Sequence, residues 1–107
     1  MAGEILVLVT CPSAESEKIA CALVQEHLAA CVNILDGVRS IYLWDGKLCN
    51  EKEDLLVIKS SNKVWNELRQ RVEALHSYDV PEIIAMPVQD GHKPYIDWMN
   101  EAVNARQ

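Results

Sequence analysis

The sequence has 107 residues, half of them apolar and 24% of them charged, and its formal net charge is −6. This length and composition indicate one globular domain over residues 1–107, rather than a disordered or multidomain chain. Because affinity for nucleic acid depends on an excess of Lys and Arg, the acidic balance argues against DNA or RNA as a partner.

The first residues and the cysteines bear on where the protein works. Residues 1–4 carry no basic side chain, and the apolar run over residues 5–9 is too short for a signal peptide or a membrane span. The four cysteines include no C-x-x-C pair, so neither a zinc ribbon nor a dithiol redox site is expected. We therefore expect a cytoplasmic protein with reduced thiols and no membrane partner.

In chain order, the first predicted elements are a strand and a helix. Residues 5–9 (ILVLV) form a continuous apolar run, which is typical of a strand buried on both faces. Residues 10–13 interrupt this run, with Pro12 suited to the first turn of a helix and Ser13 to its N-cap. An apolar stripe over residues 19–28 then predicts an amphipathic helix.

A long hairpin is predicted next. One strand begins at Cys31, is bulged or bent at residues 36–37 (DG), and resumes as far as Trp44. Residues 45–46 (DG) are a strong signal for a tight hairpin turn. Residues 47–53 are polar and form the returning arm of the hairpin.

The second half of the chain repeats the pattern of strand, helix and strand. Residues 55–58 (LLVI) form a second continuous apolar run. Residues 60–62 (SSN) supply caps for a helix whose apolar stripe covers residues 64–75. After a connector at residues 76–81, residues 82–88 predict a fourth strand.

The order of elements predicts the α+β, ferredoxin-like fold, in which a split βαβ pattern (βαββαβ) is followed here by a C-terminal helix over residues 95–103. In this topology the first and third strands are central, and these are the two continuous apolar runs. The fourth strand lies at an edge of the sheet, where Pro87 is tolerated because an edge strand can do without one backbone donor.

The two apolar strands also predict an oligomer. Two helices cover only one face of a four-stranded sheet, so several Val, Leu and Ile side chains would remain on the other face. At about 25 cal/mol per Å², leaving them in water is unfavourable by several kcal/mol, and such a surface usually marks an interface. The alternative is that the final helix covers this second face.

Five segments, in order over nearly the whole chain, carry a resemblance to a known family. They are AACVNI at residues 29–34, SIYLWDG at 40–46, LVIK at 56–59, HSYDVPEI at 76–83 and YIDW at 95–98. Together they resemble motifs of the CutA divalent-cation-tolerance family. The resemblance implies a ferredoxin-like fold, a tight homotrimer with PII-like architecture, and a link to divalent metals, copper especially.

Two features depart from the family pattern. Ser77 stands where the connector motif has proline, which is expected to loosen the connector without changing its path. The metal ligands proposed for the family are a cysteine late in the first strand and two adjacent histidines before the connector. Here Val9 and Leu75 occupy two of these positions, and only His76 remains. The resemblance therefore implies one metal ligand, His76, with weak binding of copper or another divalent cation and no required cofactor.

Other chemistries find less support in the sequence. Cys31, His76 and Glu82 could act as nucleophile, base and orienting group, but no local signature accompanies them. Neither apolar run contains the aromatic residues of an RNA-recognition module. Residues 10–15 lack the arginine of a phosphate-binding loop. Lys59 and Glu82 could form an ion pair or hold a polar ligand together.

We expect a ligand-binding cleft near a subunit boundary, built from residues of the family-like segments, most of which begin or end strands. These residues are Cys31, Asn33, Trp44, Lys59, His76, Tyr78, Glu82 and Trp98. The predicted function is a trimeric, non-enzymatic binding or sensing protein linked to copper and other divalent-metal tolerance. Two alternatives stay open: a small-molecule hydrolase with an intersubunit site, and a structural scaffold for a protein partner.

Overall fold

The computed structural model describes residues 3–105, which form a four-stranded antiparallel sheet in the order β2-β3-β1-β4. The elements are β1 (Glu4–Cys11), α1 (Ser13–Gln25), β2 (Cys31–Trp44), β3 (Lys47–Ser61), the 3-10 turn η1 (Asn62–Val64), α2 (Trp65–Leu75), β4 (Ile83–Pro87) and α3 (Lys93–Asn104). The first and third strands are central, as predicted, and the ferredoxin-like fold is confirmed.

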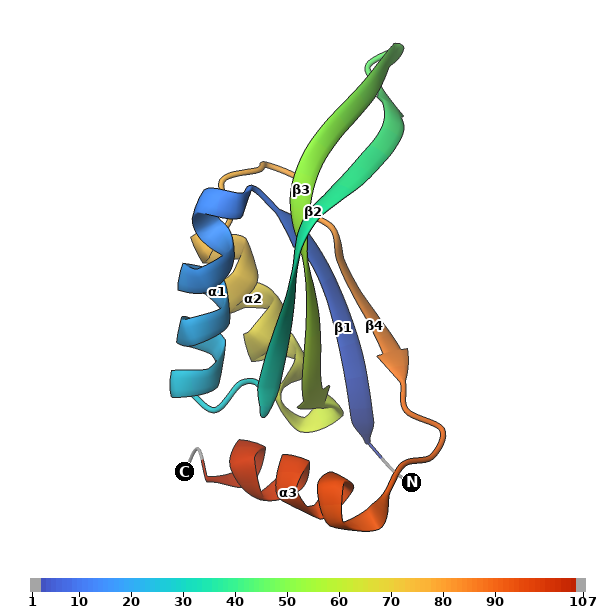
Figure 1. Cartoon of the computed structure of the whole chain (residues 1–107). Helices are drawn as coiled ribbons and strands as arrows, with labels where there is room; N and C mark the ends of the chain where they lie inside the picture. The colour runs from blue at the N-terminus through green and yellow to red at the C-terminus, as the bar shows by residue number, and fades with distance from the viewer. Residues whose placement is uncertain (1–2, 106–107) are drawn as a thin grey trace.

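The helices α1 and α2 lie together on one face of the sheet, whereas α3 runs across its lower end (Figure 1). From α3, Ile96, Met99 and Val103 pack into the core below the strands. The alternative that the final helix covers the second face is therefore not what the structure shows. Within residues 3–105, no helix is long and apolar enough to cross a membrane.

The core lies between the sheet and the two long helices. Val7 of β1 pairs with Ile58 of β3, and both side chains are fully buried. Because side chains alternate between the faces of a strand, the next residues of the same strands point to the other side. The core cluster on the helix side also includes Val9, Leu56, Ile19, Leu23, Leu68 and Val72.

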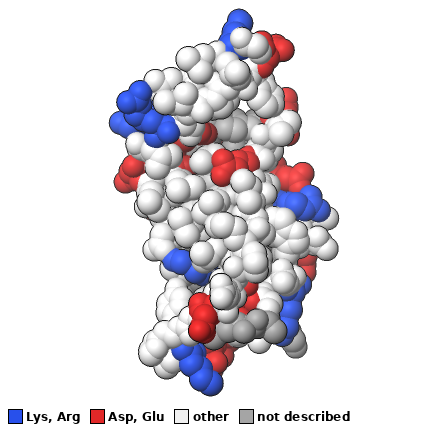
Figure 2. All heavy atoms as spheres, turned by 90° about the vertical axis from the view of Figure 1, so that its right-hand side faces the viewer, with Lys and Arg blue, Asp and Glu red and all other residues white. Residues whose placement is uncertain are grey.

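The second face of the sheet is the surface that we call the open face. Its apolar side chains come from all four strands: Leu6, Leu8, Leu35, Leu55, Val57, Ile84 and Met86. Leu8 lies at its centre between Val57 and Ile84, and Ile84 is 50% exposed. Figure 2 looks onto this face and shows a broad uncharged centre. Burial of the central strands on both faces is thus incomplete in a single chain.

The strands β2 and β3 continue beyond the sheet as a two-stranded arm, which projects from the top of the molecule (Figure 1). β1 pairs with β3 only from Asp54 onward, so residues 38–53 pair only with one another. The predicted bulge is confirmed: the register shifts before Val38, and Gly37 has a φ of 68° that suits glycine. The arm ends at the predicted turn over residues 45–46.

Two predicted boundaries at the start of α1 are wrong. β1 extends to Cys11 because β3 still offers it a pairing partner, Asp54. Pro12 occupies the N-cap position, and Ser13 is the first helical residue. The hydroxyl of Ser13 donates to the Asp54 carboxylate at 2.8 Å instead of capping the helix. The Ser13 hydroxyl, which local sequence preference assigns to the helix cap, therefore bonds Asp54, a residue distant in the sequence.

Asp54 ties α1 and the bulge of β2 to the central strand β3. This residue is 2% exposed. Its carboxylate accepts hydrogen bonds from the hydroxyl of Ser16 at 2.7 Å and from that of Ser13 at 2.8 Å. It also accepts one from the amide of Gly37 at 3.2 Å. These hydrogen bonds hold the pKa of Asp54 below its ordinary value of 3.8, and the bond from Ser16 has the largest effect. Burial acts in the opposite direction.

We expect acid to weaken the fold through Asp54. Because its pKa is lower in the folded than in the unfolded chain, the folded state binds fewer protons. The stabilisation is therefore complete above the unfolded pKa and is lost as the pH falls through the folded pKa. Urea midpoints of the wild type should fall more steeply between about pH 5 and pH 2 than those of Asp54→Asn. Parallel curves for the two proteins would contradict this assignment.

Candidate functional site

In a single chain, the predicted site residues fall into two groups at opposite ends of the open face. The lower group contains Cys31, Asn33, Lys59 and Trp98, and the upper group contains Trp44, His76, Tyr78 and Glu82. Lys59 pairs with Leu6, whereas Glu82 accepts from Thr10, four residues further along β1. That spacing corresponds to about 13 Å, so Lys59 and Glu82 form no ion pair within one chain. One cleft shared between subunits stays a prediction.

The lower group is a small hydrogen-bonded cluster beside α3. The ammonium group of Lys59 donates to the side-chain oxygen of Asn33 and lies 3.8 Å from the sulfur of Cys31. Tyr95 reaches this cluster through a hydrogen bond with Cys31, and burial together with the Cys31 contact raises the pKa of Tyr95. The Trp98 ring lies 5.5 Å from that of Tyr95. Trp98 therefore lies beside Tyr95 at the border of the cluster.

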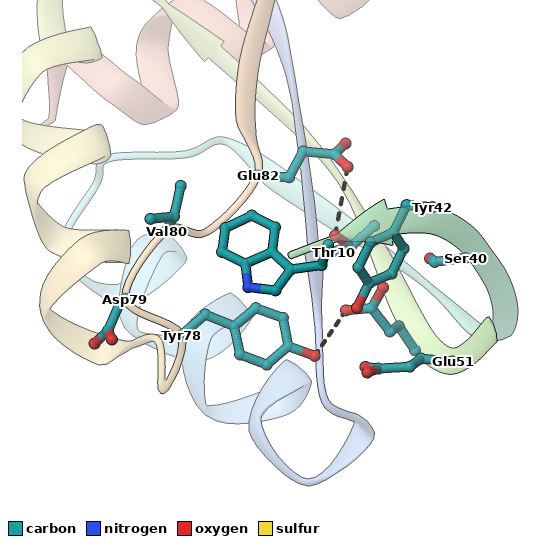
Figure 3. Close-up of a pocket in the computed structure, with 10 residues that line it drawn as sticks. Thr10, Ser40, Tyr42, Glu51, Tyr78, Asp79, Val80 and Glu82 are labelled. Carbon is teal, nitrogen blue, oxygen red and sulfur yellow. Dashed lines mark hydrogen bonds between the residues drawn. The ribbon is translucent and has the colours of Figure 1, made fainter. Parts of the chain in front are cut away.

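The upper group surrounds a pocket of about 520 Å³ where the arm meets the end of β1 and the connector between α2 and β4. Its lining residues are Thr10, Ser40, Tyr42, Trp44, Glu51, Glu53, Tyr78, Asp79, Val80 and Glu82. Tyr42 comes from the arm and Tyr78 from the connector, as the close-up shows (Figure 3). A volume of this size lies within the range of about 300–1,000 Å³ that small-molecule sites occupy.

The pocket is acidic, since its lining contains Glu51, Glu53, Asp79 and Glu82 but neither Lys nor Arg. The hydroxyl of Tyr78 donates to the Glu53 carboxylate at 2.9 Å. Burial and this hydrogen bond raise the pKa of Tyr78 well above its ordinary value.

The second phenol of the pocket is held in the same way. Burial, followed by a hydrogen bond to Glu51, raises the pKa of Tyr42 to about 12. Both Tyr42 and Tyr78 are therefore protonated at neutral pH, so they act as hydrogen-bond donors and not as general bases.

His76 lies behind the pocket wall and is only 8% exposed. Its Nε2 atom is 2.8 Å from the carbonyl oxygen of Thr10, and its Nδ1 atom accepts from the amide of Tyr78 at 3.1 Å. This pattern requires the hydrogen to be on Nε2. The ring also lies 4.7 Å from that of Tyr78. His76 therefore fastens the connector to β1 and positions Tyr78 in the pocket wall.

This arrangement bears on the predicted metal ligand. Both ring nitrogens of His76 are hydrogen-bonded, so the ring must give up one bond before it can coordinate an ion. Within residues 3–105, no three His, Cys, Asp or Glu side chains are grouped closely enough to hold a metal ion. Cys11 is fully buried, and burial followed by the charge of Asp54 raises its pKa to about 11. That thiol stays protonated at neutral pH.

Comparison with known sequences identifies the family to which the chain is similar. The family described as CutA1 divalent ion tolerance protein matches residues 5–102. The chain belongs to the CutA1 family. The divalent-cation tolerance protein CutA of Thermus thermophilus is 48% identical over 99 residues, which cover 92% of this chain and 96% of that protein. The chloroplastic CutA of Arabidopsis thaliana is 44% identical over 99 residues, or 92% of this chain and 54% of the longer plant protein.

Solved CutA structures share this architecture over most of the chain. The Thermus thermophilus structure has a TM-score of 0.90 and 46% identity, covering 92% of this chain and 97% of that one. The structure of PII-like protein CutA from Nostoc sp. PCC 7120 has a TM-score of 0.87 and 37% identity, covering 92% of this chain and 96% of that one. The predicted membership of the CutA family and the predicted fold are both confirmed.

Sequence reasoning left several pocket residues of this CutA1-family chain out of the site. These residues are Thr10, Ser40, Tyr42, Glu51, Glu53, Asp79 and Val80. The alternation of side chains between the two faces of a strand is the sequence signal that could have identified some of them. Ser40 and Tyr42 share a face with Trp44, and Ser40 is paired with Glu51 across the arm. No comparable signal indicates that Asp79 and Val80 of the connector close the pocket.

Proposed function

We propose that this CutA1-family chain is a trimeric, non-enzymatic binding protein that works in the cytoplasm and senses divalent metal, copper in particular. The observation that carries the proposal is the position of the acidic pocket at the upper edge of the open face. Figure 2 shows acidic groups above the uncharged centre of that face, and further acidic groups below it. A surface that joins subunits therefore adjoins a surface that attracts cations, so that a bound ligand and the assembly can influence each other.

The trimer rests on the open face and the arm. Burying the apolar side chains of all four strands at an interface is favourable by about 25 cal/mol for each Å² of apolar surface removed from water. The arm offers unpaired edges that a neighbouring copy can extend, and its exposed apolar residues include Ile41, Leu43 and Leu48. Every subunit carries a charge of −6, so charge opposes the association and added salt should not dissociate the trimer.

The non-enzymatic role is proposed because the three candidate catalytic groups lie apart within one chain. Cys31 lies at the lower end of the open face, whereas His76 and Glu82 lie at the upper end. The hydrogen bonds of His76 to the backbone occupy the atoms that a general base would use. His76 thus has a positioning role, which favours binding over turnover.

We expect copper to bind weakly, with a dissociation constant above about 1 µM. Imidazole suits copper, but His76 must release the Thr10 carbonyl or the Tyr78 amide to provide it. Calorimetry on the wild type, with His76→Ala as the test and the exposed His92→Ala as the matched control, should show binding weakened only by His76→Ala. Light scattering of the same samples should give three times the 12.0 kDa chain mass.

Three results would contradict this proposal. Binding below 1 µM that survives His76→Ala would place the metal on other ligands. A wild-type protein that is well folded but monomeric in solution would contradict the proposed trimer. Turnover on a panel of ester, amide and phosphoester substrates that is lost with Cys31→Ala would favour the hydrolase instead.

A further inference from the structure

We propose that the acidic pocket binds an organic ammonium ion, such as the trimethylammonium group of choline. This inference goes beyond divalent-metal sensing and does not require metal at His76. The pocket combines three aromatic side chains with four carboxylates, and its lining contains no basic side chain. Aromatic faces and nearby negative charge are the groups that recognise alkylammonium ions.

The aromatic side chains come from two separate segments. Tyr42 and Trp44 are alternate residues of β2, so they stand on the same face of the arm. Tyr78 belongs to the connector, and His76 holds it there through its amide. Figure 3 shows the rings of Tyr42 and Tyr78 approaching one another from the arm and from the connector. Aromatic surface from both sides is thus available to one ligand.

Glu53 supplies an independent reason to expect a cation. Glu53 is 4% exposed, and its carboxylate accepts a hydrogen bond from the neutral phenol of Tyr78 at 2.9 Å. Buried carboxylates are normally compensated by a positive charge. No Lys or Arg lines the pocket, and the other carboxylates there add charge of the same sign. A cationic ligand would provide the compensation that the residues lining the pocket do not.

The same geometry argues against a metal ion held tightly by the pocket carboxylates, in keeping with the weak copper binding expected at His76. The Glu51 and Glu53 carboxylates bond Tyr42 and Tyr78, and Glu82 accepts from Thr10 at 3.5 Å. No group of three carboxylate, thiol or imidazole side chains converges within residues 3–105. A metal ion needs several oxygen or nitrogen ligands at roughly 2.0–2.6 Å. A pocket of about 520 Å³ with aromatic walls instead fits a molecule of several heavy atoms.

Choline and its neutral isostere 3,3-dimethyl-1-butanol test the proposal, because they differ chiefly in the positive charge. The chain contains three tryptophans, whose indole N–H signals can be assigned by single Trp→Phe variants. In metal-free buffer with a chelator, choline should shift the Trp44 signal saturably and leave that of Trp65, which packs against the core, unchanged. The neutral alcohol should bind at least about tenfold more weakly, as expected when cation–π contacts are lost.

Charge-removing variants separate the pocket from the rest of the acidic surface. Glu51→Gln and Glu53→Gln keep the size of the side chain and should each weaken choline binding by about tenfold. The matched control is Glu101→Gln, on the exposed side of α3, which should change nothing. Light scattering and circular dichroism of each variant establish that assembly and fold are retained.

Two outcomes would overturn the proposal. If choline leaves the Trp44 signal in place, the pocket does not take this ligand class. If the neutral alcohol binds as tightly as choline, the pocket is an apolar cleft and its charge has no role. Neither outcome affects copper binding, which the chelated buffer excludes, so the metal-sensing proposal is judged separately.

Discussion

Replacing Leu8 with aspartate is expected to convert the proposed trimer into a folded monomer of 12.0 kDa. Leu8 lies at the centre of the open face between Val57 and Ile84, where an interface would enclose it. Burying an unpaired carboxylate costs several kcal/mol, and every subunit would contribute one. In the isolated chain the same side chain is only half-buried, so the aspartate can remain in water and the core stays intact.

Light scattering across a concentration series measures this effect, and circular dichroism establishes that the monomer is folded. Leu8→Met is the matched control, because it keeps an apolar side chain of similar volume and should keep the trimer. A Leu8→Asp protein that still has the mass of three chains would show that the open face is not the interface. The assembly would then have to rest on the arm alone.

The second large effect is expected on the opposite side of the same strand. Ile58 is fully buried between the sheet and the two helices. Ile58→Ala should therefore lower the free energy of unfolding by about 2–5 kcal/mol through lost burial and the cavity that remains. Because the cavity lies inside each subunit, the shift in the urea midpoint should be similar at all protein concentrations.

Val57 is the neighbouring residue, and it points to the open face. Val57→Ala should leave the isolated subunit almost unchanged but weaken association. Its urea midpoint should therefore coincide with that of the wild type at concentrations so low that both proteins are dissociated, and should fall below it at concentrations where the wild type assembles. If Val57→Ala and Ile58→Ala behave alike at every concentration, the two faces do not have the separate roles assigned to them.

The order and type of the elements could be predicted from the sequence because each has a strong local signal. The runs at residues 5–9 and 55–58 are apolar at every position, which suits the two central strands. The bulge near Gly37 and the turn at residues 45–46 depend on local backbone preference. The end of β1 could not be predicted, because the pairing of Cys11 with Asp54 joins residues far apart in the chain.

The candidate site was harder to predict for the same physical reason. Alternation within a strand shows that Tyr42 and Trp44 share a face, but it does not show which other segment they meet. Tyr78 approaches them because His76 fixes the connector to β1. Trp98, in an equally family-like segment, instead packs beside Tyr95 at the other end of the sheet. Membership in a conspicuous motif therefore does not determine which residues become neighbours.

The strand pairings of the sheet differ widely in the sequence separation of the residues that they join. We expect this difference to set the order in which the parts of the chain fold. Trp44 pairs with Lys47 across the turn, whereas Ile5 must find Pro87 near the other end of the chain. Contacts between nearby residues close first, within about 1–10 µs for a hairpin, and distant pairings follow more slowly. The arm should therefore exist early as a ribbon with both edges unpaired. During that interval, crowded nascent chains are most exposed to joining through the wrong edge.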